Sequence, residues 1–235
     1  MQAMHQGSAH RPSVPLGELT EIYLNGKAAG RIRCDPGLIP APGQYLLARA
    51  VHDSDAPLAT PVFSAGLCPG GFTPARPLPL NWFPGARLHV RGPLGKGFQL
   101  HPTARFVALV AFSENPARLL ALTEPALAQN AAIVLLTDNP PEGLPAAIEI
   151  SPLSALAETM RWADTLAFDA PKAALPALLR LVAATTYSGD AQVFVETAIP
   201  CGGMGECGVC AVNLRKGYKL ACKDGPVFDL KTSLE

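Results

Sequence analysis

Short apolar alternations separated by turn residues fill the N-terminal part of the chain, from Leu16 to Leu100. Apolar side chains at every second position are typical of strands, and several short strands without helical periodicity predict a small antiparallel β-barrel. The stretch Pro69–Pro84 holds too many prolines for a central strand and is expected to be a surface excursion. The expected strands are Glu21–Leu24, Ala29–Cys34, Tyr45–Val51, Pro61–Ala65 and Arg87–Val90.

The hydrophobic pattern changes after Arg105. A strand-like run at Phe106–Phe112 is followed by a helical stretch from Pro116 to Gln129 and by a second strand-like run at Ala132–Thr137. This β-α-β order predicts an open, mainly parallel sheet flanked by helices, similar to nucleotide-binding α/β domains. Further segments of this domain are expected at Ala146–Ile150, Ser154–Arg161, Thr165–Phe168, Lys172–Ala184 and Ala191–Glu196.

These patterns and a cysteine-rich C-terminal segment divide the chain into four parts. We expect a mobile tail at residues 1–15, a barrel at 16–101, an α/β domain at 102–196 and a C-terminal module at 197–235. The tail lacks the apolar region of a signal peptide, so the protein is expected in the cytoplasm. The longest apolar runs fall short of the roughly 20 residues that a membrane-spanning helix needs, and no membrane association is expected.

The charge composition argues against a nucleic-acid partner. Lys plus Arg and Asp plus Glu each number 19 in the 235 residues, which gives a formal net charge of zero. Because binding to a polyanion needs a broad basic field, nucleic acid is not expected as a partner. Hydrophobic residues make up 49% and charged residues 16%, so the chain is expected to fold rather than to be disordered.

Four of the six cysteines lie close together near the C-terminus. Five residues separate Cys201 from Cys207, two separate Cys207 from Cys210, and eleven precede Cys222. A cysteine-rich loop with a more distant fourth cysteine is typical of a plant-type [2Fe–2S] site. The glycines of the loop allow it to wrap closely, because glycine adopts positive φ without strain. We therefore predict that these four thiolates converge to ligate one [2Fe–2S] cluster.

Other uses of the cysteines stay open. A structural zinc site usually pairs two Cys-x2–4-Cys knuckles, whereas Cys207–Cys210 is one such knuckle. Disulfides are not expected in a cytoplasmic protein. Gly203–Gly208 matches G-x-G-x-x-G, but a dinucleotide-binding turn must open a helix, and the residues that follow are strand-like. The isolated Cys34 and Cys68 are expected to be small buried side chains far from the other four.

The C-terminal segment closely resembles one family. The spacing Cys-Gly-x-x-Gly-x-Cys-x-x-Cys, followed by Cys222-Lys-Asp-Gly-Pro-Val-Phe228, is similar to the electron-transfer subunit of NAD-linked dihydroorotate dehydrogenase, within the ferredoxin-reductase-like family. Pro42–Tyr45 is similar to that family's barrel motif Pro-Gly-Gln-Phe, and Gly85–Phe98 resembles its Gly-Pro-Leu-Gly-x-Gly-Phe passage. The resemblance extends from about Leu16 to Phe228 and identifies this chain as a divergent member.

The resemblance implies an FAD-binding barrel, a nucleotide-binding α/β domain and a C-terminal [2Fe–2S] module. It also implies a catalytic flavoprotein partner, a dihydroorotate dehydrogenase, and hence a place in pyrimidine biosynthesis. Substrate chemistry would belong to that partner, so no catalytic residue is assigned to this chain. The family usually has four residues between its first two ligands, and the fifth residue here predicts a bulge between Cys201 and Cys207.

The flavin motifs are only partly present. The family's Arg-Pro-x-Ser motif, whose Arg would bind the FAD pyrophosphate, corresponds to Pro61-Val-Phe-Ser64, which keeps only the Ser. The family's Gly-x-Gly-Thr turn is loosely represented by Gly70-Gly-Phe-Thr73. Flavin binding therefore stays open at this stage. The candidate FAD-binding residues are Ser64, Gly70, Gly71 and Thr73.

The nicotinamide motifs have diverged further. The family's Gly-Gly-Gly-x-Gly turn corresponds to Ala111–Asn115, where Phe112 adds bulk and Glu114 adds negative charge. The later Cys-Gly-Pro motif corresponds to Asp169–Pro171, so a second carboxylate faces the same expected pocket. We therefore predict that the chain does not bind NAD(H).

Two classes of function remain after these steps. The first is an electron-transfer subunit whose [2Fe–2S] cluster passes single electrons to or from a catalytic oxidoreductase, with Met204 and Val209 as candidate partner contacts. The second is a non-redox accessory subunit whose thiolate loop holds a metal only to stabilise the fold.

Overall fold

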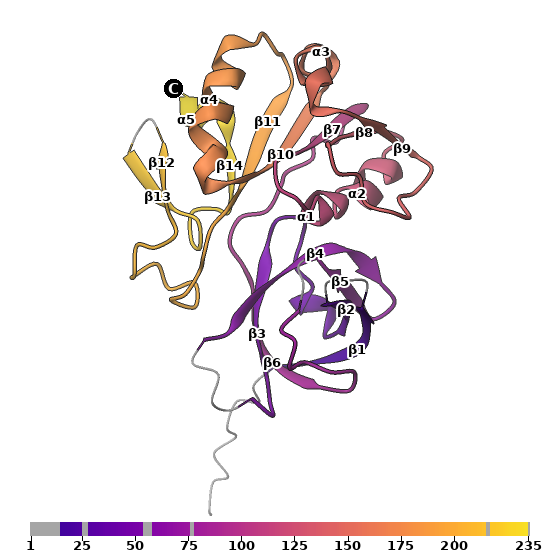
Figure 1. Cartoon of the computed structure of the whole chain (residues 1–235), viewed down its shortest axis with the longest axis vertical. Helices are drawn as coiled ribbons and strands as arrows, with labels where there is room; N and C mark the ends of the chain where they lie inside the picture. Colours follow the sequence, from indigo (N-terminus) through magenta and orange to yellow (C-terminus); the bar gives the residue numbers. More distant parts are fainter. Residues whose placement is uncertain (1–14, 25–27, 54–57, 76–77, 215–216, 235) are drawn as a thin grey trace, which may run out of the picture.

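A computed structural model describes residues 15–24, 28–53, 58–75, 78–214 and 217–234. In these ranges a barrel forms one lobe and an α/β sheet the other, and a small hairpin near the C-terminus lies to the side (Figure 1). The expected tail lies outside the described residues except for Pro15. None of the described helices combines the length and the apolar character needed to span a bilayer.

The barrel is closed by six antiparallel strands in the order β1-β2-β5-β4-β3-β6. Alternate side chains point inward, and Leu19, Ile32, Leu46, Phe72 and Leu88 are fully buried in its core. The predicted small antiparallel barrel is thus confirmed. Its strands are β1 (Leu16–Leu24), β2 (Ala28–Arg33), β3 (Tyr45–Ala50), β4 (Thr60–Cys68), β5 (Gly71–Pro74) and β6 (Arg87–Leu94).

The Pro-rich stretch is not a simple surface excursion. Its first part is the strand β5, which pairs with both β2 and β4 inside the barrel. Pro74 stands at the last position of this strand, so its missing N–H does not interrupt the ladder. Leu78 and Trp82 of the following loop are buried in the barrel core. Prolines therefore bound the strand rather than prevent it.

The second lobe is a six-stranded sheet in the order β14-β11-β10-β7-β8-β9. β7 to β11 are parallel, and β14 is antiparallel to β11 at one edge, which confirms the predicted mainly parallel sheet. The strands are β7 (Phe106–Ala111), β8 (Ala132–Leu136), β9 (Ile148–Ser151), β10 (Thr165–Pro171), β11 (Asp190–Glu196) and β14 (Val227–Asp229).

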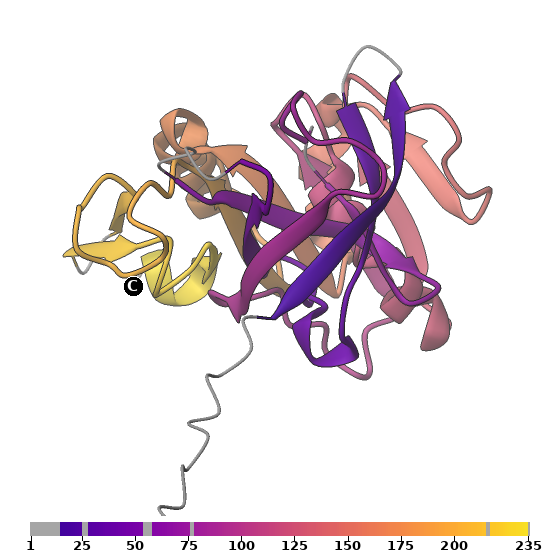
Figure 2. The ribbon, with the colours of Figure 1, turned by 90° about the horizontal axis from the view of Figure 1, so that it is seen from below.

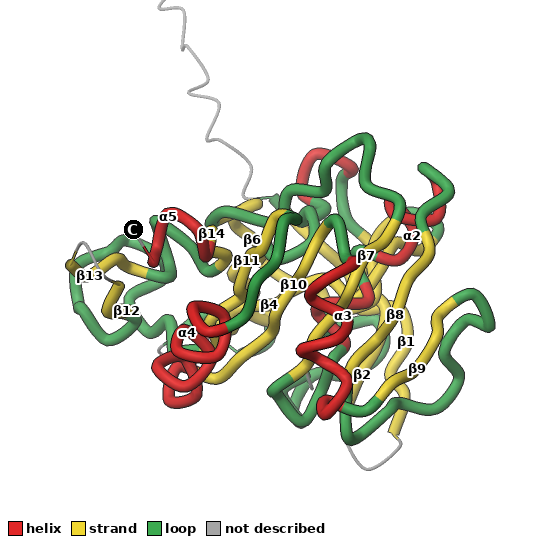
Figure 3. The backbone as a smooth tube through the Cα atoms, turned by 90° about the horizontal axis from the view of Figure 1, so that it is seen from above, coloured by secondary structure: helices red, strands yellow, loops and turns green. Residues whose placement is uncertain are grey.

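Helices cover both faces of this sheet. The first two lie on the side facing the barrel, and the two longer ones lie on the opposite side (Figure 1, Figure 3). Three 3-10 turns, Pro36–Leu38, Leu153–Ala155 and Lys172–Ala174, complete the connections. The helices are α1 (Ala117–Leu120), α2 (Thr123–Ala128), α3 (Leu156–Trp162) and α4 (Leu175–Ala184).

The helical stretch predicted at Pro116–Gln129 consists of two short helices, α1 and α2, rather than one continuous helix. Pro125 explains the break, because a proline has no N–H to donate and its ring clashes with the carbonyl four residues earlier, that of Ala121. Ala121 is the C-cap of α1, directly after its last residue, Leu120.

The C-terminal residues return to the α/β lobe. After a two-stranded hairpin, β12 (Ala211–Leu214) and β13 (Gly217–Leu220), the chain forms β14 and then α5 (Leu230–Leu234). β14 pairs with β11, so it extends the main sheet. The hairpin projects to one side of the molecule (Figure 2). The three domain boundaries drawn from the sequence stay predictions.

Candidate metal centre and cofactor sites

Residues 201–210 form a loop of turns between β11 and β12. Gly202, Gly203, Gly205 and Gly208 have φ of 64°, 75°, 81° and 71°. A residue with a Cβ is strained in this left-handed region, so the path of the loop depends on its glycines.

The structure brings the thiols of the four C-terminal cysteines together. The thiols of Cys201 and Cys207 are hydrogen-bond neighbours, and the thiol of Cys222 contacts those of Cys210 and Cys201. Cys210 and Cys222 are buried, Cys201 is half-buried and Cys207 is exposed. All six cysteines of the chain are free thiols.

The other two cysteines lie on the barrel. Cys34 follows β2 and Cys68 ends β4. The sequence predicted buried side chains for both cysteines, and in the structure both are only partly buried. Burial raises the pKa of Cys34 to about 11, with Asp35 and Cys68 adding to the shift, so its thiol stays protonated at neutral pH.

Backbone amides point at the sulfurs of the loop. Desolvation acts to raise the pKa of Cys201, but hydrogen bonds from the N–H groups of Gly205, Glu206 and Cys207 lower it to about 6. The N–H of Cys222 donates to Sγ of Cys210 at 3.5 Å. Burial and the contact with Cys210 raise the pKa of Cys222 to about 12. Hydrogen bonds from backbone amides to the sulfurs are one of the interactions that set the reduction potential of an iron–sulfur cluster.

The thiol pairs match the demand of a two-iron cluster. In the ranges that the structure describes, no three or more His, Cys, Asp or Glu side chains are grouped around a position for one metal ion. A [2Fe–2S] cluster requires a different arrangement, because its four thiolates are shared between two irons. Cys201 contacts Cys207, Cys222 contacts Cys210, and a further contact between Cys201 and Cys222 joins the two pairs, so the four thiols can be shared in this way. The donor set therefore fits such a cluster.

Two barrel residues support the loop. The hydroxyl of Tyr45, on β3, donates to the carbonyl oxygen of Cys222 at 2.9 Å, and this bond is buried. The guanidinium of Arg91, on β6, donates to the carbonyl oxygen of Gly202. Tyr45 could be singled out from the sequence because it is the last residue of the Pro42–Tyr45 motif. Arg91 could not, since its role depends on Gly202, which is far away in the chain.

The four candidate FAD-binding residues do not converge. The hydroxyl of Ser64 on β4 is engaged locally, accepting from the N–H of Gly66 at 3.1 Å and donating to its carbonyl. Gly70 lies in the turn of the β4–β5 hairpin, and Gly71 is the first residue of β5. Thr73 is near Ser64, whereas that turn is at the opposite end of the hairpin, where Cys68 pairs with Gly71.

The expected nucleotide crevice is occupied by a buried ion network. The sheet order reverses at β7 and β10, the place where open α/β sheets bind ligands beyond the carboxyl ends of their strands. At this place Arg118 of α1 donates to both carboxylate oxygens of Asp169, at 2.8 and 2.9 Å. It also donates to the carboxylate of Glu196, at 3.0 and 3.2 Å. Asp169 is fully buried and Arg118 nearly so.

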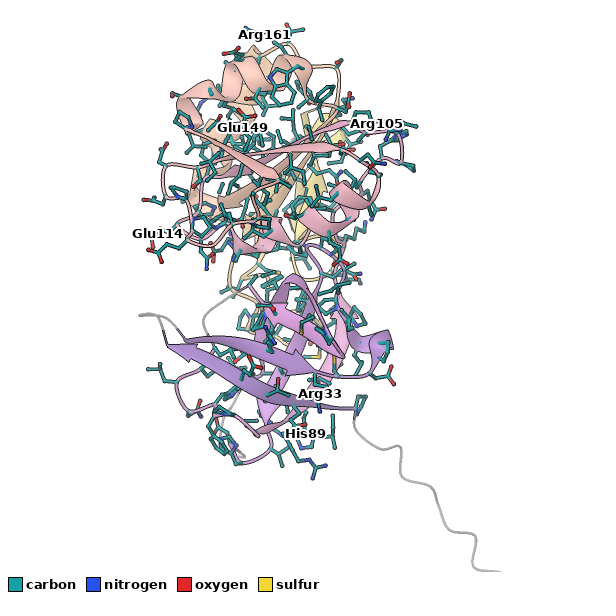
Figure 4. All side chains as sticks on the ribbon, turned by 90° about the vertical axis from the view of Figure 1, so that its right-hand side faces the viewer. Arg33, His89, Arg105, Glu114, Glu149 and Arg161 are labelled. Carbon is teal, nitrogen blue, oxygen red and sulfur yellow. The ribbon has the colours of Figure 1, made fainter. Side chains whose placement is uncertain are left out.

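This network corrects part of the sequence argument about nicotinamide binding. Asp169 does not present a free negative charge to a pocket, because Arg118 neutralises it. Glu114 is exposed and points outward at the edge of the α/β lobe (Figure 4). Phe112 is half-buried and stacks on Phe168, with ring centroids 6.4 Å apart.

A cleft of about 1030 Å³ lies elsewhere, between the loop after β6, strand β11 and the C-terminal residues. Gln44, Gln99 and Gln192 line it together with Asp224 and Asp229. None of the four candidate FAD-binding residues lines this cleft, and neither does Asp169.

Comparison with known proteins identifies the C-terminal module. Residues 196–232 match the iron–sulfur cluster binding domain of dihydroorotate dehydrogenase B. No curated protein sequence matches the chain. The family match covers the loop, the hairpin and β14, and it confirms the resemblance found in the C-terminal motif.

Solved structures share the fold over both lobes. An NADH-dependent reduced ferredoxin–NADP oxidoreductase, studied for flavin-based electron bifurcation, gives a TM-score of 0.70 at 17% identity, covering 95% of this chain and 94% of that chain. The ferredoxin reductase of carbazole 1,9a-dioxygenase gives 0.56 at 17% identity, covering 72% and 64%. The Amycolatopsis cytochrome P450 reductase GcoB gives 0.50 at 15% identity, covering 73% and 66%. The fold is therefore that of ferredoxin-reductase-like proteins.

Replacing Gly203 by Ala should destabilise the protein more than replacing Gly208 by Ala. Both positions have positive φ, which costs an Ala about 1–2 kcal/mol. A Cβ at Gly203 would also lie 2.7 Å from the buried Tyr45 hydroxyl, whereas a Cβ at Gly208 meets no atom within 4 Å. Denaturant unfolding of the two variants measures the difference, and equal midpoints would contradict the close packing of the loop on β3.

Replacing Asp169 by Ala should lower the free energy of unfolding by about 1–3 kcal/mol, because the Arg118 guanidinium loses two buried hydrogen bonds while Glu196 still compensates its charge. The matched control is Arg31→Ala, which removes an exposed ion pair with Glu21 at 3.5 Å and should cost no more than about 1 kcal/mol. Urea denaturation measures both. Similar losses in the two variants would contradict a buried network.

Proposed function

We propose that this chain is an electron-transfer subunit in which Cys201, Cys207, Cys210 and Cys222 ligate a [2Fe–2S] cluster. The observation that carries the proposal is the arrangement of these four thiols in two contacting pairs on a glycine-dependent loop, within a segment that matches an iron–sulfur cluster binding domain. Such a cluster, when bound, accepts and passes on single electrons.

Different residues of the chain would ligate the cluster and support its loop. Cys201 and Cys207 would ligate one iron near the surface, and Cys210 and Cys222 would ligate the other beneath it, since the first pair is more exposed than the second. The amides directed at Cys201 stabilise negative charge on its sulfur. Tyr45 fixes the backbone of Cys222, and Arg91 fixes the backbone of Gly202.

The partner in this proposal is a catalytic flavoprotein of the dihydroorotate dehydrogenase type, which would place the chain in pyrimidine biosynthesis. The family match of residues 196–232 supports this choice. Substrate oxidation would take place on the partner, and this chain would connect the partner to a second redox protein.

The second candidate function is an accessory subunit with a structural metal. The contact between the buried Cys210 and Cys222 favours this structural role. A metal bound by these two thiolates would link the two ends of the hairpin close to β14. Electron paramagnetic resonance of anaerobically prepared protein separates the two functions. A signal that appears on reduction supports the electron carrier, and colourless protein with stoichiometric zinc supports the structural role.

Replacing Cys222 by Ser should remove or strongly diminish the visible absorption and the iron content, because the buried iron would lose a ligand. Cys68→Ser is the matched control, since Cys68 is a free thiol on the barrel, and it should leave both unchanged. Optical spectra and iron analysis measure the effect. Equal losses of absorption and iron in the two variants would contradict the assignment of Cys222 as a ligand.

Among the residues that the structure describes in the C-terminal module, Met204, Val209 and Tyr218 have exposed apolar side chains. Exposed apolar residues beside a redox centre suit a protein contact that brings the next centre close. Met204→Asp should therefore slow electron transfer to the catalytic flavoprotein without changing the cluster spectrum. Leu80→Asp is the control, because Leu80 is 92% exposed but lies on the barrel. Stopped-flow rates that are unchanged by the Met204 replacement would argue against the contact.

NADH should neither bind tightly nor reduce the cluster. A pyrophosphate at the carboxyl ends of β7 and β10 would have to displace Arg118 from its carboxylates, and breaking a buried ion pair costs about 3–5 kcal/mol. Calorimetric titration with NADH, followed by optical measurement of NADH-dependent reduction, tests this. Binding in the micromolar range with rapid reduction would show that the crevice opens.

A further inference from the structure

The junction between the barrel and the sheet is filled by the chain's own side chains. Phe63 of β4 packs edge-on against Phe194 of β11, with ring centroids 5.0 Å apart, and tilted against Tyr45 at 5.6 Å. The Arg118 guanidinium lies 4.6 Å from the centroid of the Phe194 ring and 6.0 Å from that of Phe63. The solvent exposure of Phe63 is 3% and that of Phe194 is 1%. These residues belong to one hydrophobic core that spans both lobes.

A flavin at this junction would need three things that the structure does not provide there. Its ring system needs an open slot, but Phe63 is packed on all sides. Its pyrophosphate needs a charged fork or free backbone amides, but Pro61 stands at the expected position of the Arg. A hydroxyl at Ser64 would have to reach the ligand, but it is bonded to Gly66 on its own strand.

The glycine pair lies within the barrel sheet. Gly71 is the first residue of β5 and pairs with Arg33 of β2 and with Cys68 of β4, and Gly70 stands in the turn between β4 and β5. The described residues between β5 and β6 contain no helix whose N-terminus could receive a phosphate. The residues present therefore do not fit an FAD.

We infer that this chain holds no flavin and that its cluster exchanges electrons only with other proteins. The inference deepens the proposed function, on which it rests. Each turnover then adds one electron to the cluster and removes one electron from it, with no hydride acceptor on this chain. A two-electron donor such as NADH would have to be oxidised by a flavin on another protein, which then delivers its electrons one at a time.

The decisive experiment measures flavin and iron separately in protein purified anaerobically with its cluster. We expect about two irons and two sulfides per chain, only trace flavin after acid release, and no quenching of FAD fluorescence when FAD is added in excess. Stoichiometric flavin together with the cluster would overturn the inference and leave the proposed function standing. Stoichiometric zinc without sulfide would overturn the proposed function, while the flavin content would still decide whether the junction is closed.

A pair of variants tests the packing that the inference depends on. Phe63→Ala should lower the melting temperature of the flavin-free protein by roughly 10 °C, because it removes a buried aromatic side chain. Phe83→Ala is the control, since Phe83 is 52% exposed, and it should change the melting temperature little. If Phe63 instead lined a slot left open for a flavin ring, the two variants would behave alike, and the inference would fail.

Discussion

The buried guanidinium of Arg118 sets the arrangement of the two lobes. A charge in this position is tolerated only with compensation, and two carboxylates and two aromatic rings supply it. The carboxylates come from the ends of β10 and β11, and one of the rings comes from the barrel. Moving the barrel relative to the sheet would therefore expose the shared core and weaken the surroundings of this charge. The cluster loop depends on the same alignment, because it starts from β11 and rests on β3 and β6.

The order of the elements could be predicted because it depends on local periodicity. Short apolar segments of four to seven residues between turn residues predicted barrel strands such as β3, and continuous apolar runs predicted β7 and β8. Prolines account for two differences between the predicted and the observed elements. Pro125 divides the predicted helical stretch into α1 and α2, and the density of prolines around β5 hid a strand that pairs with β2 and β4. In both cases the position of the proline within the helix or strand determined whether that element formed, and composition alone does not give this position.

The candidate site could be predicted only in part. The spacing of the cysteines and the glycines between them are local, so the thiol loop was visible in the sequence. Arg118, Glu196 and Arg91 were not identified, because their roles arise from contacts between positions 51 to 111 residues apart. Asp169 was noticed but its charge was misjudged, since nothing near it in the sequence shows that a guanidinium is its partner. Long-range pairing, rather than residue type, determines these roles.

The cluster-binding segment begins and ends on neighbouring strands. β11 precedes it and β14 follows it, and Phe194 pairs with Val227 across the two. The separation of its ends is thus fixed by one ladder of the sheet, whatever the length of the chain between them. Because the entropy of closing a loop grows only with the logarithm of its length, an inserted residue costs a small fraction of 1 kcal/mol, at about 0.6 kcal/mol per doubling. Closure entropy therefore places little limit on the length of the segment, and the limit comes instead from the glycines of its loop and from its contacts with Tyr45 and Arg91.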